Sequence, residues 1–77
     1  MELEDKLSTI TNNELRKLIA EHTRITSTRD SSMVGASPTL LVLHNLTTQF
    51  NYWDKVRELA KAFETEVVNR FTGGVIN

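Results

Sequence analysis

This chain of 77 residues contains no cysteine, one proline and three glycines. The absence of cysteine excludes disulfides and thiolate metal sites as a source of stability. The longest apolar run, residues 40–43, is far shorter than the roughly 20 residues that cross a bilayer. The acidic N-terminal segment also lacks the apolar stretch of a secretory signal, so we expect a cytoplasmic protein with no membrane contact.

Two further absences narrow the possible functions. The net charge is −1, whereas a dedicated nucleic-acid-binding protein usually carries a marked basic excess. The sequence contains no Gly-x-Ser-x-Gly element, no glycine-rich phosphate loop and no His-x-x-x-His spacing. Its two histidines, His22 and His44, fall in apolar surroundings and are interpreted as core residues. We therefore expect no catalytic, cofactor-binding or metal site, and a protein that is not an enzyme.

The composition that remains suits one folded domain over residues 1–77, since 39% of the residues are apolar and 25% are charged. Apolar residues at helical spacing predict a short helix over residues 2–10. Thr11 and Glu14 form a capping-box pattern, which predicts a break near residue 11 and a second helix over 12–25. The apolar face of this second helix comprises Leu15, Leu18, Ile19, His22 and Ile25.

The second half of the chain begins with a polar connection over residues 26–37, rich in serine and threonine. Ser37 then offers an N-cap, and Pro38 suits the first helical position because its missing amide hydrogen costs nothing there. The next strong stop signal is the glycine pair at 73–74. These two signals predict one long helix over residues 38–72.

A helix of 35 residues would be about 50 Å long, whereas a globular chain of this size is only about 25–30 Å across. One solution is a break near residues 47–51, where Thr48 or Asn51 could cap a new helix. The other is a continuous or gently kinked helix whose overhang pairs with another subunit. A heptad register that runs unbroken through residues 47–51 favours the continuous helix, and the break remains the alternative.

That heptad register is the most distinctive pattern in the chain, and its steps alternate between four and three residues. Its members are Val42, Leu46, Gln49, Trp53, Val56, Ala60, Phe63 and Val67. Such a stripe lies along one helix face and is buried by packing against another helix. Aromatic residues on or beside it either fill a core or form an anchoring surface at a protein interface. We therefore predict a protein interface formed by Leu46, Phe50, Trp53, Val56, Ala60, Phe63, Val67 and Phe71.

A smaller basic group offers a second possibility. Possible phosphate contacts are Arg16, Lys17, Arg24 and Arg29. Residues 10–19, Ile-Thr-Asn-Asn-Glu-Leu-Arg-Lys-Leu-Ile, loosely resemble the first helix of SAP-type DNA-binding domains. The resemblance covers about ten residues. Gly35-Ala36-Ser37-Pro38 replaces the glycine and lysine that such a domain has before its next helix, so no function is carried over from it.

The sequence thus predicts an all-α fold: a helical hairpin with a short N-terminal helix and a long C-terminal helix, completing a bundle by dimerisation. The predicted function is a small non-enzymatic protein-binding module, such as an assembly factor, adaptor or inhibitor of phage or bacterial type. A nucleic-acid-associated regulator that uses the basic group is the alternative. We expect a homo-oligomer, with a dimer as the first choice, and the pattern does not identify any other protein target.

Overall fold

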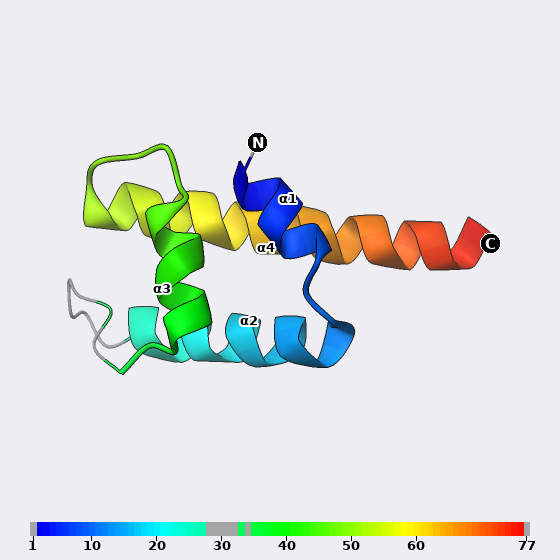
Figure 1. Cartoon of the computed structure of the whole chain (residues 1–77), viewed down its shortest axis with the longest axis horizontal. Coiled ribbons are helices and arrows are strands. Elements are labelled where there is room, and N and C mark those ends of the chain that lie inside the picture. Colours follow the sequence, from blue (N-terminus) through cyan, green and yellow to red (C-terminus); the bar gives the residue numbers. More distant parts are fainter. Residues whose placement is uncertain (1, 28–32, 34, 77) are drawn as a thin grey trace.

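In a computed structural model of the chain, residues 2–27, 33 and 35–76 are described, with side chains up to Phe71. The described residues form four helices and contain no strand, so the all-α prediction is confirmed. The helices are α1 (Glu2–Ser8), α2 (Asn12–Thr26), α3 (Pro38–Asn45) and α4 (Tyr52–Ile76). Figure 1 shows α2 and α4 running in opposite directions, with α3 between them in the chain. The sequence predicted a hairpin of only two main helices here.

The short helix α1 ends at Ser8, two residues before the predicted end. The hydroxyl groups of Ser8 and Thr9 donate hydrogen bonds to the carbonyl oxygens three residues earlier, each at 2.7 Å. Side-chain hydroxyls that bond nearby carbonyls compete with the helical pattern, which favours an end at this point. The predicted cap of α2 is confirmed, because Thr11 Oγ1 accepts a hydrogen bond from the amide of Glu14 at 3.2 Å.

The start of α3 also follows the prediction, since Ser37 Oγ accepts a hydrogen bond from the amide of Leu40 at 3.3 Å and Pro38 opens the helix. In the preceding connection, Gly35 has a φ of +83°, a left-handed conformation that residues with a β-carbon adopt only at a cost. Met33 packs partly against the core, as expected. The similar expectation for Val34 lies outside the described residues.

The single helix predicted over residues 38–72 is wrong, and the alternative with two helices is confirmed. Asn45 ends α3, and Asn51 caps α4 by accepting a hydrogen bond from the amide of Trp53 at 2.9 Å. The carboxylate of Glu58 holds the connection in place. It accepts hydrogen bonds from the amide and the hydroxyl of Thr48, both at 2.7 Å. These local bonds explain a break that the heptad register conceals.

The glycine pair at 73–74 does not end α4, which continues to Ile76. A glycine inside a helix costs about 1 kcal/mol relative to alanine, too little by itself to stop a helix whose earlier turns are held by packing. The 25 residues of α4 match the long axis of the molecule, which measures 41 × 22 × 18 Å. Figure 1 shows the C-terminal part of α4 projecting beyond the other helices.

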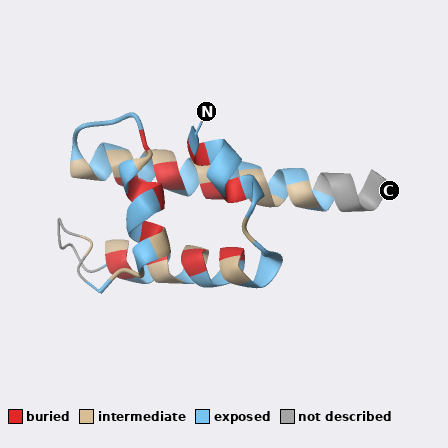
Figure 2. Cartoon of the chain, in the orientation of Figure 1, coloured by how far each residue is buried: buried red, intermediate tan, exposed pale blue. Residues whose placement is uncertain are grey.

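The core forms where α1, α2 and α3 pack against α4. Figure 2 shows its buried positions on the sides of the helices that turn towards the interior. Its members are Leu3, Leu7, Leu15, Leu18, Ile25, Leu40, Leu43, Leu59 and Phe63. Leu40, Leu43 and Leu59 are fully buried although they lie off the heptad stripe. The break lets α3 turn independently of α4, so the stripe is not one continuous buried face.

Candidate protein-binding surface

The predicted interface contains both buried and exposed residues. Val56 and Phe63 are buried, with 9% and 3% of their surfaces exposed. Leu46 and Val67 are partly buried against that core, and Ala60 is exposed. Phe50 is fully exposed in the connection before α4. Trp53 and Phe71 are exposed large side chains of α4.

A different line of residues on α4 is largely exposed to solvent, and only its member Val67 is partly buried. We call it the α4 seam, and its members are Trp53, Arg57, Ala60, Glu64, Val67 and Phe71. Their spacing alternates between four and three residues, so they share one side of the helix. This side lies next to the buried face formed by Val56, Leu59 and Phe63. The α4 seam therefore shares Trp53, Ala60 and Val67 with the predicted stripe and also contains the charged residues Arg57 and Glu64.

A groove accompanies the α4 seam between α2 and α4, and we call it the α2/α4 groove. Its larger section is a hollow of about 300 Å³ with a mostly apolar lining: Ile19, His22, Thr23, Ala60, Phe63, Glu64, Val67 and Val68. A second section of about 150 Å³ adjoins it at Val67 and is lined by Asn12, Leu15, Arg16, Val67, Arg70 and Phe71. The exposed fraction is 55% for Val68 and 66% for Phe71, so both apolar side chains are available to a partner.

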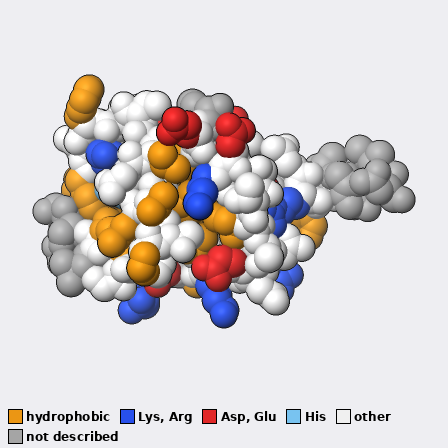
Figure 3. Space-filling view, viewed as in Figure 1, with side chains coloured by type: hydrophobic (Ala, Val, Ile, Leu, Met, Phe, Trp, Pro, Cys, Tyr) orange, Lys and Arg blue, Asp and Glu red, His pale blue; other side chains and the backbone are white. Residues whose placement is uncertain are grey.

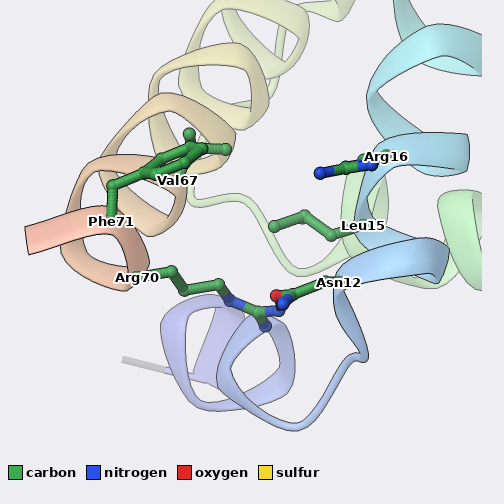
Figure 4. A pocket seen from close by; sticks show the side chains of 6 residues that line it. All are labelled: Asn12, Leu15, Arg16, Val67, Arg70 and Phe71. Atoms are coloured by element: carbon green, nitrogen blue, oxygen red, sulfur yellow. Dashed lines mark hydrogen bonds between the residues drawn. The ribbon is translucent and has the colours of Figure 1, made fainter. Parts of the chain in front are cut away.

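Figure 4 shows the second section from close by, with Val67 and Phe71 on α4 and Leu15 and Arg16 on α2. At its end Arg70 extends from α4 towards Asn12, and the two side chains form a hydrogen bond of 2.7 Å between Arg70 Nη1 and Asn12 Oδ1. The groove is therefore bounded by two helices and by an arginine that connects them.

Arg70 makes three further hydrogen bonds. Its Nη2 atom donates to the carbonyl oxygens of Leu7 at 2.9 Å and Ile10 at 2.5 Å, both next to the end of α1. Its Nε atom donates to Glu66 Oε1 at 2.8 Å. The spacing of Glu66 and Arg70 indicates only a pair on one helix face, and no local pattern indicates that Arg70 holds α1 and α2 against α4. These bonds keep the two walls of the groove in a defined relation.

A second apolar surface belongs to α3. Leu41 and Val42 are exposed there, with 39% and 45% of their surfaces accessible. Figure 3 shows hydrophobic side chains gathered over α3 on this face of the molecule. Val42 belongs to the heptad register that was predicted to be buried. Because α3 ends at Asn45, the orientation of Val42 does not follow that of the register residues on α4.

The described members of the basic group, Arg16, Lys17 and Arg24, occupy two sides of α2. Lys17 and Arg24 are exposed and seven residues apart, so they share a side of α2. Arg16 instead lines the α2/α4 groove. Arg29 lies outside the described residues. The described geometry thus offers no observation that favours a phosphate-binding surface over a protein-binding one.

Both histidines are buried, as the sequence predicts, and each packs against an aromatic ring. His22 meets the edge of Phe63 with ring centres 5.6 Å apart, and His44 lies 5.5 Å from Tyr52. Within the described residues, His22 Nε2 and His44 Nδ1 have no hydrogen-bond partner. Burial lowers the pKa of both imidazoles from 6.5. Repulsion from the protonated form of His44 lowers the pKa of His22 further, and the positive charge of Lys55 does the same for His44. Both rings are therefore neutral core groups at pH 7.

The described part of the chain offers neither a metal site nor a membrane-spanning helix. No three His, Asp or Glu side chains converge there in a way that could hold a metal ion. None of the helices α1 to α4 combines the length and the apolar character needed to span a membrane.

Comparison with protein-family models, with curated proteins and with solved structures finds no match to this chain. The function therefore has to be inferred from the α2/α4 groove itself.

Proposed function

We propose that this chain is a small non-enzymatic protein-binding module that receives a helix of its partner in the α2/α4 groove. The observation that carries the proposal is the apolar lining of this groove next to two largely exposed apolar side chains, Val68 and Phe71. Full burial of a valine or phenylalanine side chain contributes about 1.5–3 kcal/mol. Two such side chains together with the apolar groove wall favour association with another protein.

The shape of the groove supports a helix as the bound element. Its two walls are the antiparallel helices α2 and α4, and an amphipathic helix laid between two helices extends them into a bundle. Arg70 fixes the relation of the walls, so little of the binding free energy is used to order the site. An adaptor, assembly factor or inhibitor that acts by helix packing fits this arrangement, and a second copy of the chain is the first choice of partner.

The proposal is tested by binding experiments with one groove variant and one control. Val68→Asp places a charge on the groove wall, whereas Leu41→Asp places the same charge on the exposed face of α3. Proteins retained from an extract of the native host are identified, purified and titrated against each variant. We expect a protein, or the chain itself, to bind the wild type and Leu41→Asp equally and Val68→Asp at least about tenfold more weakly.

Circular dichroism of each variant confirms that it is folded before binding is compared. If Val68→Asp binds every partner as tightly as Leu41→Asp does, the groove is not the binding site. If no protein binds the wild type, the chain itself included, the proposed function is wrong.

A further inference from the structure

The α4 seam has a property that a groove for an arbitrary partner does not need: it is complementary to itself when two copies run antiparallel. The six positions are symmetric about residue 62, so Trp53 faces Phe71 of a second copy and Arg57 faces Val67. Ala60 then faces Glu64 of the second copy near the middle. Aromatic residues meet at both ends, and the smallest side chain lies close to the centre, where two helices approach most closely.

The charges of Arg57 and Glu64 favour antiparallel over parallel packing of the two α4 helices. In that arrangement Arg57 lies one turn, about 5 Å along the axis, from Glu64 of the second copy, and symmetry provides the pair twice. A parallel arrangement would instead bring Arg57 next to Arg57 and Glu64 next to Glu64 of the second copy, which is unfavourable. The Arg57 side chain is 82% exposed and its contact with Asp54 is long, at 3.9 Å, so it is available for a new partner.

From this complementarity we infer that the occupant of the α2/α4 groove is α4 of a second copy, packed antiparallel along the α4 seam in a two-fold symmetric dimer. Each α4 lies in the groove of the other chain, and α2 and α4 of both copies form a four-helix arrangement. The seam from Trp53 to Phe71 is about 27 Å long. A standard interface of about 800 Å² per partner is roughly 15% of the 5324 Å² surface of the chain. Ile19 and Thr23 on the α2 wall add to the area of the seam.

This inference rests on the proposed function, because it names the partner of the same groove. Sedimentation velocity between about 5 and 200 µM measures the monomer–dimer equilibrium, and emission of Trp53, the one tryptophan of the chain, follows its burial on association. We expect a dimer at the upper concentrations and a change in Trp53 emission over the same range. Leu41→Asp serves as the control and leaves both readouts unchanged, whereas Val68→Asp raises the dissociation constant about tenfold or more.

Charge reversal tests the direction of the pairing. Arg57→Glu alone and Glu64→Arg alone each replace two attractive pairs with two repulsive ones, so each raises the dissociation constant about tenfold. The double variant Arg57→Glu/Glu64→Arg restores both pairs in exchanged form and returns the constant to within about threefold of the wild type. Equal weakening by the singles and by the double variant overturns the antiparallel arrangement.

Cysteine cross-linking gives an independent test, because the natural chain has no cysteine. Trp53→Cys and Phe71→Cys are prepared as separate proteins, mixed at high concentration and oxidised. The antiparallel seam predicts a mixed disulfide between the two variants and little cross-linking of either variant alone, since equal positions lie about 27 Å apart. Dimers of Trp53→Cys alone would indicate parallel pairing and overturn the inference.

The outcomes separate this inference from the proposed function. In one outcome the wild-type chain stays monomeric at 200 µM, and a host protein binds it but fails to bind Val68→Asp. This result refutes the dimer and supports the groove as a site for another protein. In another outcome Val68→Asp weakens neither the dimer nor the binding of any host protein. This result refutes both the dimer inference and the proposed function of the groove.

Discussion

Replacing Arg70 with methionine should destabilise the fold more than any other single change to a charged residue considered in this protein. The Arg70 side chain is 23% exposed, and its guanidinium group donates four hydrogen bonds. Three of them connect α4 with the junction of α1 and α2. Methionine keeps the apolar stem but none of the donors, so the carbonyl oxygen of Ile10 loses the hydrogen bond from Arg70 and that of Leu7 keeps only the bond from the amide of Ile10. Glu66, which is 15% exposed, loses its cation as well.

The expected magnitude follows from these contacts. A hydrogen bond to a charged group contributes a net of about 1.5–3 kcal/mol, and solvent replaces part of this at a partly exposed site. Counting the loss of several bonds and the unpaired Glu66 carboxylate, we expect Arg70→Met to lower the free energy of unfolding by about 2–4 kcal/mol. A domain of this size has a total of roughly 4–12 kcal/mol. The melting temperature should therefore fall by at least about 10 °C.

Urea unfolding followed by circular dichroism and by Trp53 fluorescence measures this change. Arg24→Met is the matched control, because Arg24 is exposed on α2. We expect it to cost less than about 0.5 kcal/mol. Arg70→Lys keeps the charge but not the planar fork and should fall between the two. An Arg70→Met protein within about 0.5 kcal/mol of Arg24→Met would refute the proposed role of these hydrogen bonds.

Four further changes have expected outcomes. Because burial lowers the pKa of His22 and His44 below 6.5, the unfolded chain binds more protons as the pH falls below that value; the free energy of unfolding should be constant from pH 8 to 7 and decrease towards pH 5, and a flat profile would contradict neutral burial. Hydrogen bonds from Thr48 lower the pKa of Glu58, so Glu58→Gln should cost about 0.5–1 kcal/mol near neutral pH and speed amide exchange in the connection before α4, with Glu4→Gln, at an exposed position of α1, as the control. Leu59→Ala should cost about 2–5 kcal/mol in urea unfolding, whereas an equal effect of Leu41→Ala, at an exposed position of α3, would show that the buried face is misplaced. Gly35→Ala should cost about 1–2 kcal/mol by thermal unfolding, because its φ of +83° disfavours a β-carbon although none of the described atoms lies close enough to obstruct one.

Local signals in the sequence predict most helix starts correctly. Thr11 before α2 and Ser37-Pro38 before α3 act through hydrogen bonds and backbone preferences that span three or four residues, so the information is contained in the neighbouring sequence. The same holds for Asn51, which the break alternative uses as a cap. Helix ends are less well determined. The glycine pair at 73–74 is a stop signal that α4 passes through, since its effect is small compared with the packing of the preceding turns.

The heptad register shows where a correct pattern leads to a wrong structure. The spacing of four and three residues is real, but Val42 is exposed and Phe63 is buried although both belong to it. Burial depends on how each helix is rotated about its own axis, and the break before Tyr52 gives α3 and α4 separate rotations. Neither the spacing nor the composition contains that rotation, because it is decided by which faces of four helices fit together.

The sequence by itself therefore determined an all-helical chain, the caps that start α2 and α3 and the apolar residues available for a core. Only the tertiary structure decided which of those residues are buried, that a groove opens between α2 and α4, and that Arg70 links three helices. The physical reason is the range of the interactions. Caps and helical preferences act between near neighbours, whereas the bonds of Arg70 join residues about 60 positions apart in the chain and exist only once the helices have packed.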